Sequence, residues 1–558
     1  MTTARANAVI RFEPDGYDIR RPWLMGRQVA GHGFLRAAVQ GRGEAPVYGY
    51  TGAESSAEAF KALVQEIDPA ADARWIKSRD LDGLSNAGAV LYLADPALNG
   101  FARMRLRAGP GRFSLCGVTH TTATAGTMAM IADLLTAPVA PWDALICTSA
   151  AVLETVRLIH EAQADYLRWK LGPQLRLALP QLPVIPLGVH CADFQFGEAE
   201  TAQAREALGI GPDDVVALFV GRLTFTGKAH PFPIFHGLQA AAERSGKRVV
   251  LLQCGWSPNE EIAQAYVSGA AAFAPLVRTL TVDGREARAR RQAWAAADLF
   301  VSMSDGIQET FGLTPLEAMA AGLPCVVSDW NGYRETVRDG VDGFRIPTWA
   351  PGPGGFGAEA AAHLESGLMT YDAYCWAAAS ATSVDLGELA ERLTALIEQP
   401  ELRRKMGDAG RARAQQAFDW AVVFAQYQDL WAELNARRLA LTDSPEELAW
   451  AQAAPKASAA AQDPFHIFAH YPTGRIEPAV RVALEPGADM AAFRALAGHV
   501  LFTSLQASEA NTAPIVARLE RGPASVSELA AAGRLGVNTT AVIVGTLAKM
   551  GLVKVLGA

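Results

Sequence analysis

Two glutamates, Glu309 and Glu317, stand eight positions apart in the stretch IQETFGLTPLEAMAAGLP (307–324). An apolar Phe-Gly-Leu lies between them, and the stretch follows the apolar run LFVSMS (299–304). This pattern is typical of a strand that leads through a loop into a helix. Open α/β sheets bind their ligands at such junctions, outside the carboxyl ends of the strands. The two carboxylates are therefore candidates for ligand binding.

The start of the helix predicts an anion site. Thr314 has the side chain of an N-cap residue, and Pro315 suits the first helical turn. The free backbone N–H groups of Gly312, Leu313 and the first turn would then point at a bound anion. A phosphate group is the usual guest of such a site.

Each glutamate also has a simpler interpretation. Thr314 and Glu317 match the capping box S/T-x-x-E, in which the glutamate bonds back to the N-cap amide. Spacing alone favours that interpretation of Glu317. Glu309, taken by itself, is equally well explained as a solvated loop carboxylate.

Short β-rich runs alternate with amphipathic stretches of helix length along most of the chain. The expected strands are VYGY (47–50), AVLYLA (89–94), FSLCGVTH (113–120), ALICTS (144–149), PVIPLGV (183–189), VVALFVG (215–221), RVVLLQCG (248–255), LFVSMS (299–304), PCVVSD (324–329) and GFRIP (343–347). Continuous apolar strands separated by helices indicate parallel sheets covered on both faces. We therefore expect an α/β protein with two doubly wound domains in series.

The expected division of the chain has four parts. An N-terminal domain covers residues 1–184, and a second domain with closing helices covers 185–440. The Ala-rich segment 441–464 is expected to be a linker. The remaining residues, 465–558, form an appended module.

Composition sets the class of protein. The chain has 558 residues, half of them hydrophobic, which is a globular composition too long for a single core. A formal net charge of -8 gives no global attraction to nucleic acid or to an anionic membrane. The six cysteines are scattered without a CxxC pair, which favours buried reduced thiols. Since no signal peptide or membrane span is apparent, we expect a soluble, cytoplasmic protein.

Several motifs together resemble the retaining nucleotide-sugar glycosyltransferases of the GT-B fold, of the family-four type. The E-x(7)-E stretch resembles the donor-site signature of that family. The other matching segments are MGRQVAGHGFLRAA (25–38), GVTHTT (117–122), IPLGVHCADF (185–194), FVGRL (219–223) with Lys228, and SDWNGYRETVRDGVDGFRIP (328–347). The resemblance covers about residues 5–440. It implies two Rossmann-like domains with a cleft between them, the first binding the acceptor and the second the donor.

The resemblance also implies roles for single residues. Glu309 would contact hydroxyl groups of the transferred sugar, and Glu317 would bind the ribose of the nucleotide. Arg222 and Lys228 suit stabilisation of the leaving phosphate, one as a planar fork and the other as a point charge. His120 would hydrogen-bond the donor sugar, although a lone histidine after an apolar run is more often structural.

The donor-binding set is completed by a second group of residues. Gly26 would let the first helix approach the diphosphate closely, although an ordinary loop glycine is its default interpretation. The loop before the helix adds Thr310, Phe311, Gly312 and Leu313. The nucleotide sugar is a substrate here, so no cofactor is expected, and no metal ion is expected to be required.

The mechanism implied by the resemblance is substitution on the front face of the sugar, with retention of its anomeric configuration. No side chain in the sequence presents itself as a covalent nucleophile beside an activating base. Two departures from the family pattern concern the site. Arg222 and Lys228 are six positions apart instead of the usual five, and Leu187 and His190 replace the usual Asn and Asp of the interdomain segment.

The acceptor is expected to be a cell-surface glycan, a lipid-linked molecule or a protein. The segment FARMRLRAGPGR (101–112) places Arg103, Arg105 and Arg107 two positions apart, followed by Arg112. In an extended segment the first three would share one side. They would then face a phosphorylated or lipid-linked acceptor, or an anionic surface at the inner face of a membrane. A solvated strand edge explains the same pattern.

The C-terminal stretch 513–556 resembles a winged helix-turn-helix. Ser525 and Glu528 match a capping box, 533–537 supplies a turn, and Asn538 suits the N-cap of the next helix. Over 512–558 five Lys and Arg face two acidic residues, and the expected recognition helix is too apolar to read DNA. We therefore expect a small α+β module for protein interaction or self-association.

Two rival functions deserve comparison with the transferase. One is a regulator that senses a nucleotide sugar and acts through the C-terminal module. The presence of Glu309, Glu317, Arg222, Lys228 and His120 together favours turnover, because a sensor can dispense with some of them. The other is an epimerase or phosphorylase of the same fold. It fits less well, because no lysine motif for a pyridoxal cofactor is apparent.

Overall fold

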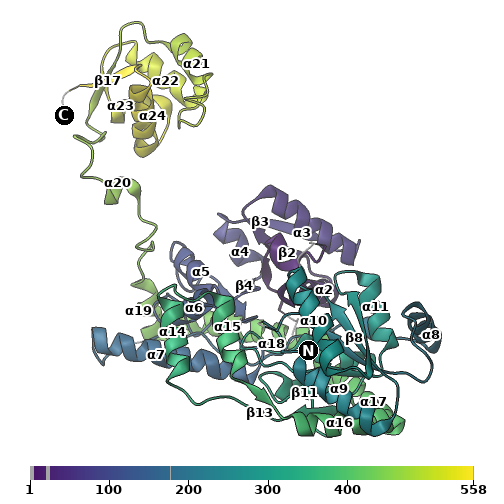
Figure 1. The fold of residues 1–558 in the computed structure, drawn as a ribbon. Helices are drawn as coiled ribbons and strands as arrows, with labels where there is room; N and C mark the ends of the chain where they lie inside the picture. Colours follow the sequence, from purple (N-terminus) through teal and green to yellow (C-terminus); the bar gives the residue numbers. More distant parts are fainter. Residues whose placement is uncertain (1–5, 21–25, 176, 226, 557–558) are drawn as a thin grey trace. The chain divides into compact units, whose positions relative to one another are not determined.

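The computed structural model of the chain describes residues 6–20, 26–175, 177–225 and 227–556. The chain divides into two compact units, Met1–Ser458 and Ala459–Ala558. The larger unit contains two six-stranded sheets, each covered by helices (Figure 1).

The first sheet is parallel throughout and has the order β3-β2-β1-β4-β5-β6. Its strands are β1 (Val9–Arg11), β2 (Val47–Thr51), β3 (Ala73–Lys77), β4 (Val90–Leu93), β5 (Ser114–Val118) and β6 (Ala144–Ile146). The helices that connect them are α2 (Gly26–Gly41), α3 (Glu54–Ile67), α4 (Leu81–Ala87), α5 (Leu98–Arg105) and α6 (Ala125–Asp133), and α7 (Ala150–Leu171) follows β6. Every residue of β4, β5 and β6 is buried, as expected for strands covered on both faces.

The second sheet repeats this topology in the order β12-β11-β10-β7-β8-β9, again parallel throughout. Its strands are β7 (Val215–Val220), β8 (Val249–Gly255), β9 (Val277–Asp283), β10 (Leu299–Ser302), β11 (Cys325–Ser328) and β12 (Gly343–Ile346). The principal helices are α8 (Glu198–Ala207), α9 (Phe232–Ser245), α10 (Glu260–Phe273), α11 (Ala287–Ala296), α12 (Leu313–Ala321), α16 (Leu386–Glu398) and α17 (Pro400–Arg413). In both sheets the winding reverses between the first strand and the fourth, β1 beside β4 and β7 beside β10. The prediction of two doubly wound, Rossmann-like domains is confirmed.

The strand predictions were wrong at edges, at prolines and at β1, a central strand of three residues that was not predicted. The run 183–189 is not a strand and forms only single bridges, from Val184 to Cys147 and from Val189 to Asp419. Pro183 and Pro186 lack the N–H groups that a ladder requires. Strands β3 and β9 were not predicted, because each is a half-exposed edge without a continuous apolar run.

Helix α18 (Trp420–Leu439) returns to the first domain after the second sheet is complete. Its apolar side packs beside α2, in one core cluster with Phe34 and Tyr92. The expected boundary at residue 440 assigned this helix to the second domain. Its buried Trp420, Tyr427 and Trp431 place it against the first sheet instead.

An excursion of the chain, residues 348–384, leaves the second sheet after β12. It begins and ends in the short antiparallel strands β13 (Thr348–Trp349) and β14 (Ser383–Val384). Between them lie two helices, α14 (Phe356–Glu365) and α15 (Tyr371–Ser380), side by side in Figure 1. No strand of the excursion joins the six-stranded sheet.

The arginine-rich segment 101–112 is not extended. Its first part belongs to α5, and the arginines therefore do not share one side. Arg103 pairs with Asp133 at 2.8 Å and Arg112 with Asp82 at 2.8 Å. This segment consequently offers no row of three arginines to an anionic surface or acceptor.

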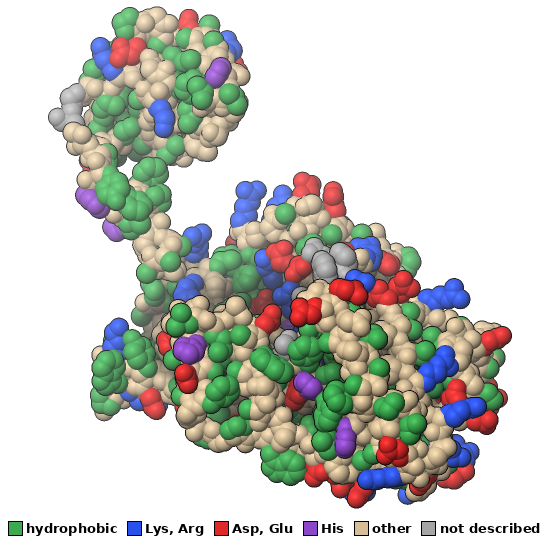
Figure 2. Space-filling model, viewed as in Figure 1, with side chains coloured by type: hydrophobic (Ala, Val, Ile, Leu, Met, Phe, Trp, Pro, Cys, Tyr) green, Lys and Arg blue, Asp and Glu red, His purple; other side chains and the backbone are tan. Residues whose placement is uncertain are grey.

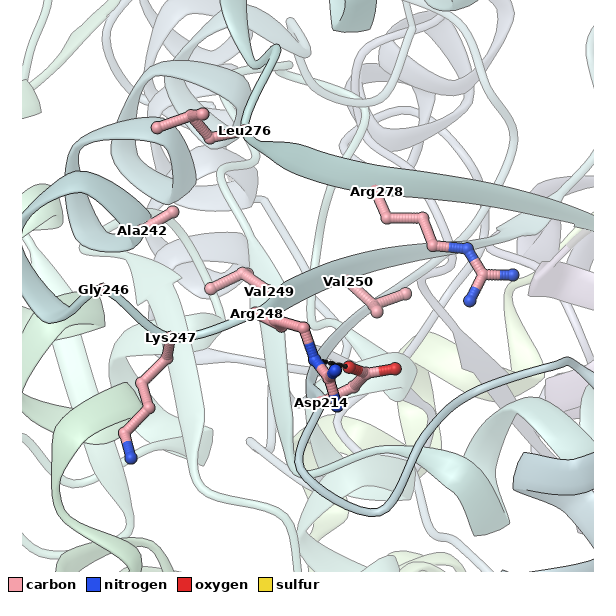
Figure 3. A pocket seen from close by; sticks show the side chains of 9 residues that line it. All are labelled: Asp214, Ala242, Gly246, Lys247, Arg248, Val249, Val250, Leu276 and Arg278. Atoms are coloured by element: carbon pink, nitrogen blue, oxygen red, sulfur yellow. Dashed lines mark ion pairs between the residues drawn. The ribbon is translucent and has the colours of Figure 1, made fainter.

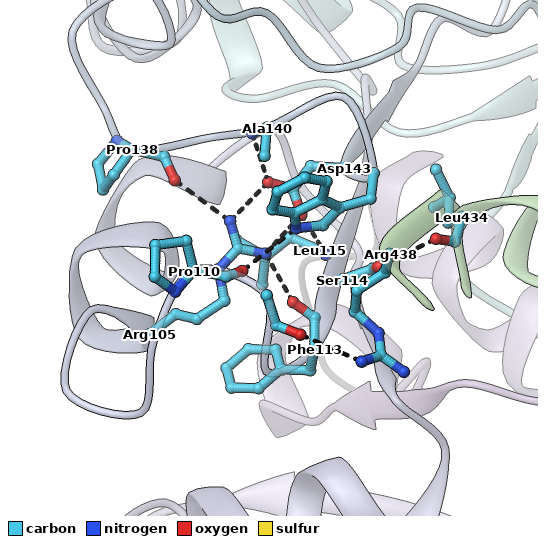
Figure 4. A network of polar contacts seen from close by, with 12 residues as sticks. Arg105, Pro110, Phe113, Ser114, Leu115, Pro138, Ala140, Asp143, Leu434 and Arg438 are labelled. Carbon is cyan, nitrogen blue, oxygen red and sulfur yellow. Dashed lines mark hydrogen bonds and ion pairs between the residues drawn. The ribbon is translucent and has the colours of Figure 1, made fainter. Parts of the chain in front are cut away.

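Arg105 is fully buried and forms a two-pronged ion pair with Asp143 (Figure 4). The Arg105 Nη1 and Nη2 atoms lie 2.6 and 2.7 Å from the two carboxylate oxygens. The guanidinium also donates to the carbonyl oxygens of Phe113 and Pro138, and Asp143 accepts from the N–H groups of Leu115 and Ala140. The network ties α5 to the beginnings of two strands, β5 and β6.

Arg105→Met should lower the free energy of unfolding by about 3–5 kcal/mol, because Asp143 would remain buried without its cation. The double variant Arg105→Met, Asp143→Leu should recover most of that loss, since it removes the stranded charge. Arg107→Met at the exposed neighbouring position is the matched control and should stay within about 0.5 kcal/mol. Urea denaturation measures all three. Equal losses at 105 and 107 would contradict a structural ion pair.

The smaller unit holds a three-stranded antiparallel sheet of order β16-β15-β17. Its elements include β15 (Arg481–Leu484), α21 (Met490–Ala497), α22 (Glu509–Leu519), β16 (Ala524–Ser525), α23 (Val526–Gly533), α24 (Val537–Lys549) and β17 (Val553–Leu556). The capping box of Ser525 and Glu528 is confirmed. The expected cap at Asn538 is wrong, because the N-cap of α24 is Gly536, two residues earlier.

Apolar side chains are exposed on the smaller unit (Figure 2). They include Phe465, Phe468 and Tyr471, and the first two line a groove together with Val542 of α24. A winged-helix relationship stays a prediction. Among the described residues of the whole chain, no helix is both long enough and apolar enough to span a membrane.

Candidate active site

The candidate residues of the second domain gather at the carboxyl ends of β7 and β10. Arg222 and Lys228 follow β7, and Glu309 follows β10. These two strands are neighbours at the point where the winding of the sheet reverses. The connections from such strands diverge to opposite faces of the sheet, which leaves a crevice for a ligand.

Lys228 and Glu309 form an ion pair, with 3.1 Å between Lys228 Nζ and Glu309 Oε2. The glutamate side chain is only 12% exposed and the lysine 38%. Burial raises the pKa of Glu309, but Lys228 and the backbone N–H groups of Phe311 and Thr310 outweigh burial, and the net pKa is lowered. Glu309 is therefore an anion at neutral pH, held by a cation from the opposite loop.

Arg222 lies beside this pair. Its Nη2 atom donates to Gln308 Oε1 at 3.2 Å. Gln308, which the sequence analysis did not single out, directly precedes Glu309 and so links Arg222 to the loop of Glu309. The six-residue interval from Arg222 to Lys228 still brings both cations to the loop of Glu309.

The loop after β11 donates two side-chain hydrogen bonds to the loop of Glu309. Asn331 adopts a positive φ of 45° and donates from Nδ2 to the carbonyl oxygen of Glu309. Trp330 donates from Nε1 to the carbonyl oxygen of Gly306 at 3.1 Å. A non-glycine residue at positive φ persists where its surroundings fix it. The position of Glu309 is therefore set by two loops together.

The first domain reaches this loop through His120 and Ser149. Thr310 Oγ1 donates to the carbonyl oxygen of His120 at 3.1 Å, and Ser149 Oγ donates to the carbonyl oxygen of Thr310 at 2.8 Å. His120 Nε2 is buried and finds no partner among the described residues. Burial and the nearby Arg27 lower the pKa of His120 to about 4. The ring is therefore neutral at pH 7.

Helix α12 begins at a glycine N-cap, Gly312, instead of at the expected side-chain cap, Thr314. Gly312 is the N-cap at φ 94°, and no side chain caps the helix. Thr314 lies inside the first turn, so the capping-box interpretation of Glu317 is wrong. A Cβ atom on Gly312 would stand 2.1 Å from the ring of Tyr333, so both the conformation and the space require glycine.

Glu317 is consequently free of a capping role. Burial raises its pKa to about 7, although Arg290 opposes the shift. A half-buried carboxyl without a cap partner suits recognition of a neutral hydroxyl group. Its role in ribose binding stays a prediction.

The remaining predicted donor-site residues differ in how deeply they are buried. Thr310 and Phe311 are buried, and the Phe311 ring packs 6.3 Å from that of Phe418. Leu313 is half-buried at the start of α12. Gly26 opens α2 in an exposed position, and a Cβ atom there would meet no atom within 4 Å. Space beside this helix start is compatible with an approaching phosphate.

Asp305 is a buried acid that the sequence analysis did not single out, although it directly follows the apolar run 299–304. It accepts from the backbone N–H of His230 through Oδ2 at 3.2 Å, and its Oδ1 has no partner among the described residues. Burial raises its pKa to about 7. Asp305 thus anchors the end of the loop that carries Lys228.

The pKa of Asp305 predicts a pH dependence of stability. In the unfolded chain this carboxyl ionises near its ordinary pKa of 3.8, but in the folded protein it stays protonated until about pH 7. Asp305 therefore lowers the free energy of unfolding as pH rises from about 4 to about 7, by on the order of 1 kcal/mol per pH unit.

Asp305→Asn removes this titration and keeps an acceptor for His230. Its free energy of unfolding relative to the wild type should increase between about pH 4 and 7 and level off above. Denaturation at several pH values measures the difference, with Asp429→Asn on the exposed side of α18 as the control. A difference that is constant across this range would refute the buried protonated state.

A separate cavity of about 410 Å³ lies by the amino ends of β8 and β9 (Figure 3). It is lined in part by Arg248 and Arg278. Arg248 is paired with Asp214 at 2.8 Å, and Arg278 donates to the carbonyl oxygen of Gly209 at 2.5 Å. Its position and these internal pairs distinguish this cavity from the candidate site. In the described part of the chain, no group of three or more His, Cys, Asp or Glu side chains is arranged to hold a metal ion.

Comparison with known proteins agrees with this geometry. Residues 214–361 match the family model described as Glycosyl transferases group 1. The chain is 31% identical over 250 residues to the alpha-maltose-1-phosphate synthase of Mycobacterium tuberculosis, which covers 44% of this chain and 54% of that protein. It is 35% identical over 173 residues to the D-inositol 3-phosphate glycosyltransferase of Actinosynnema mirum, covering 29% of this chain and 39% of that one. The aligned part spans about half of the length of the first relative.

The crystal structure of Anabaena HepE in complex with UDP matches with a TM-score of 0.50 at 16% identity, over 77% of this chain and 100% of that chain. At this identity the likeness concerns the fold. The two Rossmann-like domains therefore have the GT-B arrangement, and most of the second matches the group 1 glycosyl transferase model.

Proposed function

We propose that the protein is a retaining glycosyltransferase that transfers a hexose-like sugar from a nucleotide-sugar donor. The observation that carries the proposal is the Lys228–Glu309 ion pair beside Arg222, where the winding of the second sheet reverses. The loop of Glu309 also contacts the loop of His120 from the first domain. These contacts support a single site for the nucleotide and the sugar.

The charges fit the reaction. The bond between the anomeric carbon and the phosphate oxygen breaks, and negative charge grows on the leaving diphosphate. Arg222, Lys228 and the amino end of α12 are positioned to stabilise that charge. The acceptor oxygen forms the new bond on the same face of the sugar, and its proton passes to the departing phosphate. This route needs no covalent nucleophile from the protein.

Two groups in the site suit contact with the sugar. Glu309 is an anion that can accept hydrogen bonds from sugar hydroxyl groups, and the neutral ring of His120 has an unpartnered nitrogen. Glu317 is one helical turn into α12, where it suits the ribose. The names of the relatives support a sugar-transfer activity, and the UDP complex of HepE supports a nucleoside diphosphate as leaving group. A glycan, lipid-linked or protein molecule is proposed as acceptor.

A donor panel tests the proposal. UDP, GDP, ADP, CMP and their common sugar conjugates should be screened by thermal shift against the purified protein. One nucleotide should stand out, because a ligand at about a hundred times its dissociation constant adds roughly 2.7 kcal/mol of stability. A full panel without any shift would count against the donor site.

Variants of the two glutamates localise the effect within this panel. Glu309→Gln should reduce transfer by about 10²–10³-fold while the protein stays folded, because its partly exposed ion pair adds at most about 1 kcal/mol. Glu317→Gln should weaken nucleotide binding by about tenfold. Glu391→Gln on the exposed side of α16 is the control. Wild-type turnover in both site variants would refute the assignment of these residues.

The stereochemistry and the metal requirement are tested on the product. With the donor identified above, proton NMR of the product should show the anomeric configuration of the donor. The rate should be unchanged in excess EDTA, because Arg222, Lys228 and α12 supply the compensating charge. An inverted product would defeat the retaining mechanism, and loss of activity with EDTA that added Mg²⁺ restores would defeat metal independence.

A further inference from the structure

The excursion 348–384 is a module added to the second domain. Its two ends meet in the ladder of β13 and β14, and the N–H of Asp385 donates to the carbonyl oxygen of Pro347 at 3.0 Å directly outside it. Helix α14 is mostly exposed, with Ala360 buried and His363 and Leu364 half-buried. The six-stranded sheet is complete without these residues, so their sequence can vary without disturbing its ladder.

Helix α15 of the excursion packs on the loop that carries the phosphate-binding cations. The ring of Trp376 lies 6.0 Å from Phe225 and 6.4 Å from His230, stacked on the imidazole at 25°. Phe225 and His230 themselves are 6.1 Å apart. These ring contacts bring α15 to the stretch between Arg222 and His230.

Tyr371 occupies the first turn of this helix, close to the cleft. Thr370 caps the helix by accepting from the N–H of Ala373 at 3.2 Å, which fixes the turn. The half-buried side chain of Tyr371 interacts with the side chains of Cys375, Gln308 and Thr121. Burial, together with Cys375, raises the pKa of Tyr371 to about 12, although Gln308 and Thr121 act in the opposite direction. Its hydroxyl is therefore neutral at pH 7 and can both donate and accept.

The partners of Tyr371 come from both domains. Gln308 precedes Glu309 and accepts from Arg222 at 3.2 Å. Thr121 follows His120, whose carbonyl oxygen accepts from Thr310. The Tyr371 hydroxyl thus stands between the two loops that the proposed function assigns to the donor sugar.

We propose that Tyr371 is a specificity-determining residue whose hydroxyl binds the transferred sugar between the loops of His120 and Glu309. The inference rests on the proposed function. Convergent polar groups in a largely preformed cleft fix ligand orientation, and a neutral hydroxyl recognises sugar hydroxyl groups without an ionic cost. The excursion thereby adds a sugar contact that neither six-stranded sheet provides.

The alternative is that Tyr371 only holds α15 against the loops of His120 and Glu309 and does not contact the sugar. A fastening residue would influence the whole donor site, including the loop of Arg222 and Lys228. A sugar contact would affect only ligands that carry the sugar. The ratio of two dissociation constants, for a nucleotide sugar and for its nucleoside diphosphate, separates the two roles.

The experiment compares Tyr371→Phe with the wild type by calorimetry, using UDP, UDP-glucose, GDP, GDP-mannose, ADP and ADP-glucose. Tyr374→Phe, three residues further on the same helix, is the matched control. For the pair that the wild type prefers, Tyr371→Phe should bind the nucleotide sugar about tenfold more weakly and the nucleoside diphosphate equally well. Tyr374→Phe should match the wild type for both.

The outcomes distinguish the two levels of the proposal. If the wild type binds none of the six ligands and no ligand of the full donor panel shifts its melting curve, the proposed function fails together with the inference. If the wild type binds a nucleotide sugar and Tyr371→Phe binds it equally well, only the inference is overturned. Equal weakening for the diphosphate and its sugar conjugate would also overturn it, because that result indicates fastening of α15.

Discussion

The register between the two Rossmann-like domains depends on the way in which Trp420 is held between them. Its ring lies against Gly33 of α2 and Gly188 of the interdomain segment. A Cβ atom on either glycine would stand 2.6 or 2.5 Å from the indole, respectively. The backbone N–H of Trp420 donates to the carbonyl oxygen of Val189 at 3.0 Å. The backbone N–H of Val189 donates to the carbonyl oxygen of Phe418 at 2.8 Å. Phe418 belongs to the core of the second domain and Trp420 to that of the first. These two residues, one position apart from Asp419 on either side, therefore join the two cores.

This junction explains why loops from separate sheets can share a site. The contacts of Thr310 with His120 and Ser149 require the domains to meet in a defined register. Helix α18 contributes to that register by burying aromatic side chains beside α2, where Phe34 and Tyr92 stack at 4.1 Å. Close packing of this kind resists small displacements, because interiors hold few voids into which a ring can move.

Within the site, burial and local charge separate three acids into two protonation states. Glu309 keeps its charge because Lys228 and backbone N–H groups compensate for burial. At Asp305 the backbone N–H groups, and at Glu317 the charge of Arg290, offset burial only in part, and the pKa of each is raised to about 7. One full anion beside two carboxyls that are each about half protonated at pH 7 limits the negative charge that a diphosphate would meet. Such divergent environments are typical of sites where acids have different roles.

The sequence by itself determined the features that periodicity and local spacing encode. Alternating apolar runs and amphipathic stretches predicted two doubly wound domains, because a parallel sheet buried on both faces requires continuous apolar strands. The motif around Glu309 likewise located the loop after β10, and the residues 214–361 that match the family model include it. Edge strands β3 and β9 were not predicted, because their half-exposed residues form no continuous apolar run.

Tertiary structure decided everything that depends on partners distant in the chain. Arg105 is an exposed basic residue by its pattern, yet Asp143, 38 positions later, makes it a buried structural cation. Glu317 fits a capping box by spacing, but the ring of Tyr333 and the conformation of Gly312 set the start of α12 elsewhere. Tyr371 has no motif, and only folding brings it to Gln308 and Thr121. Local sequence fixes which elements form, whereas burial and pairing across the fold fix what each charged or polar group can do.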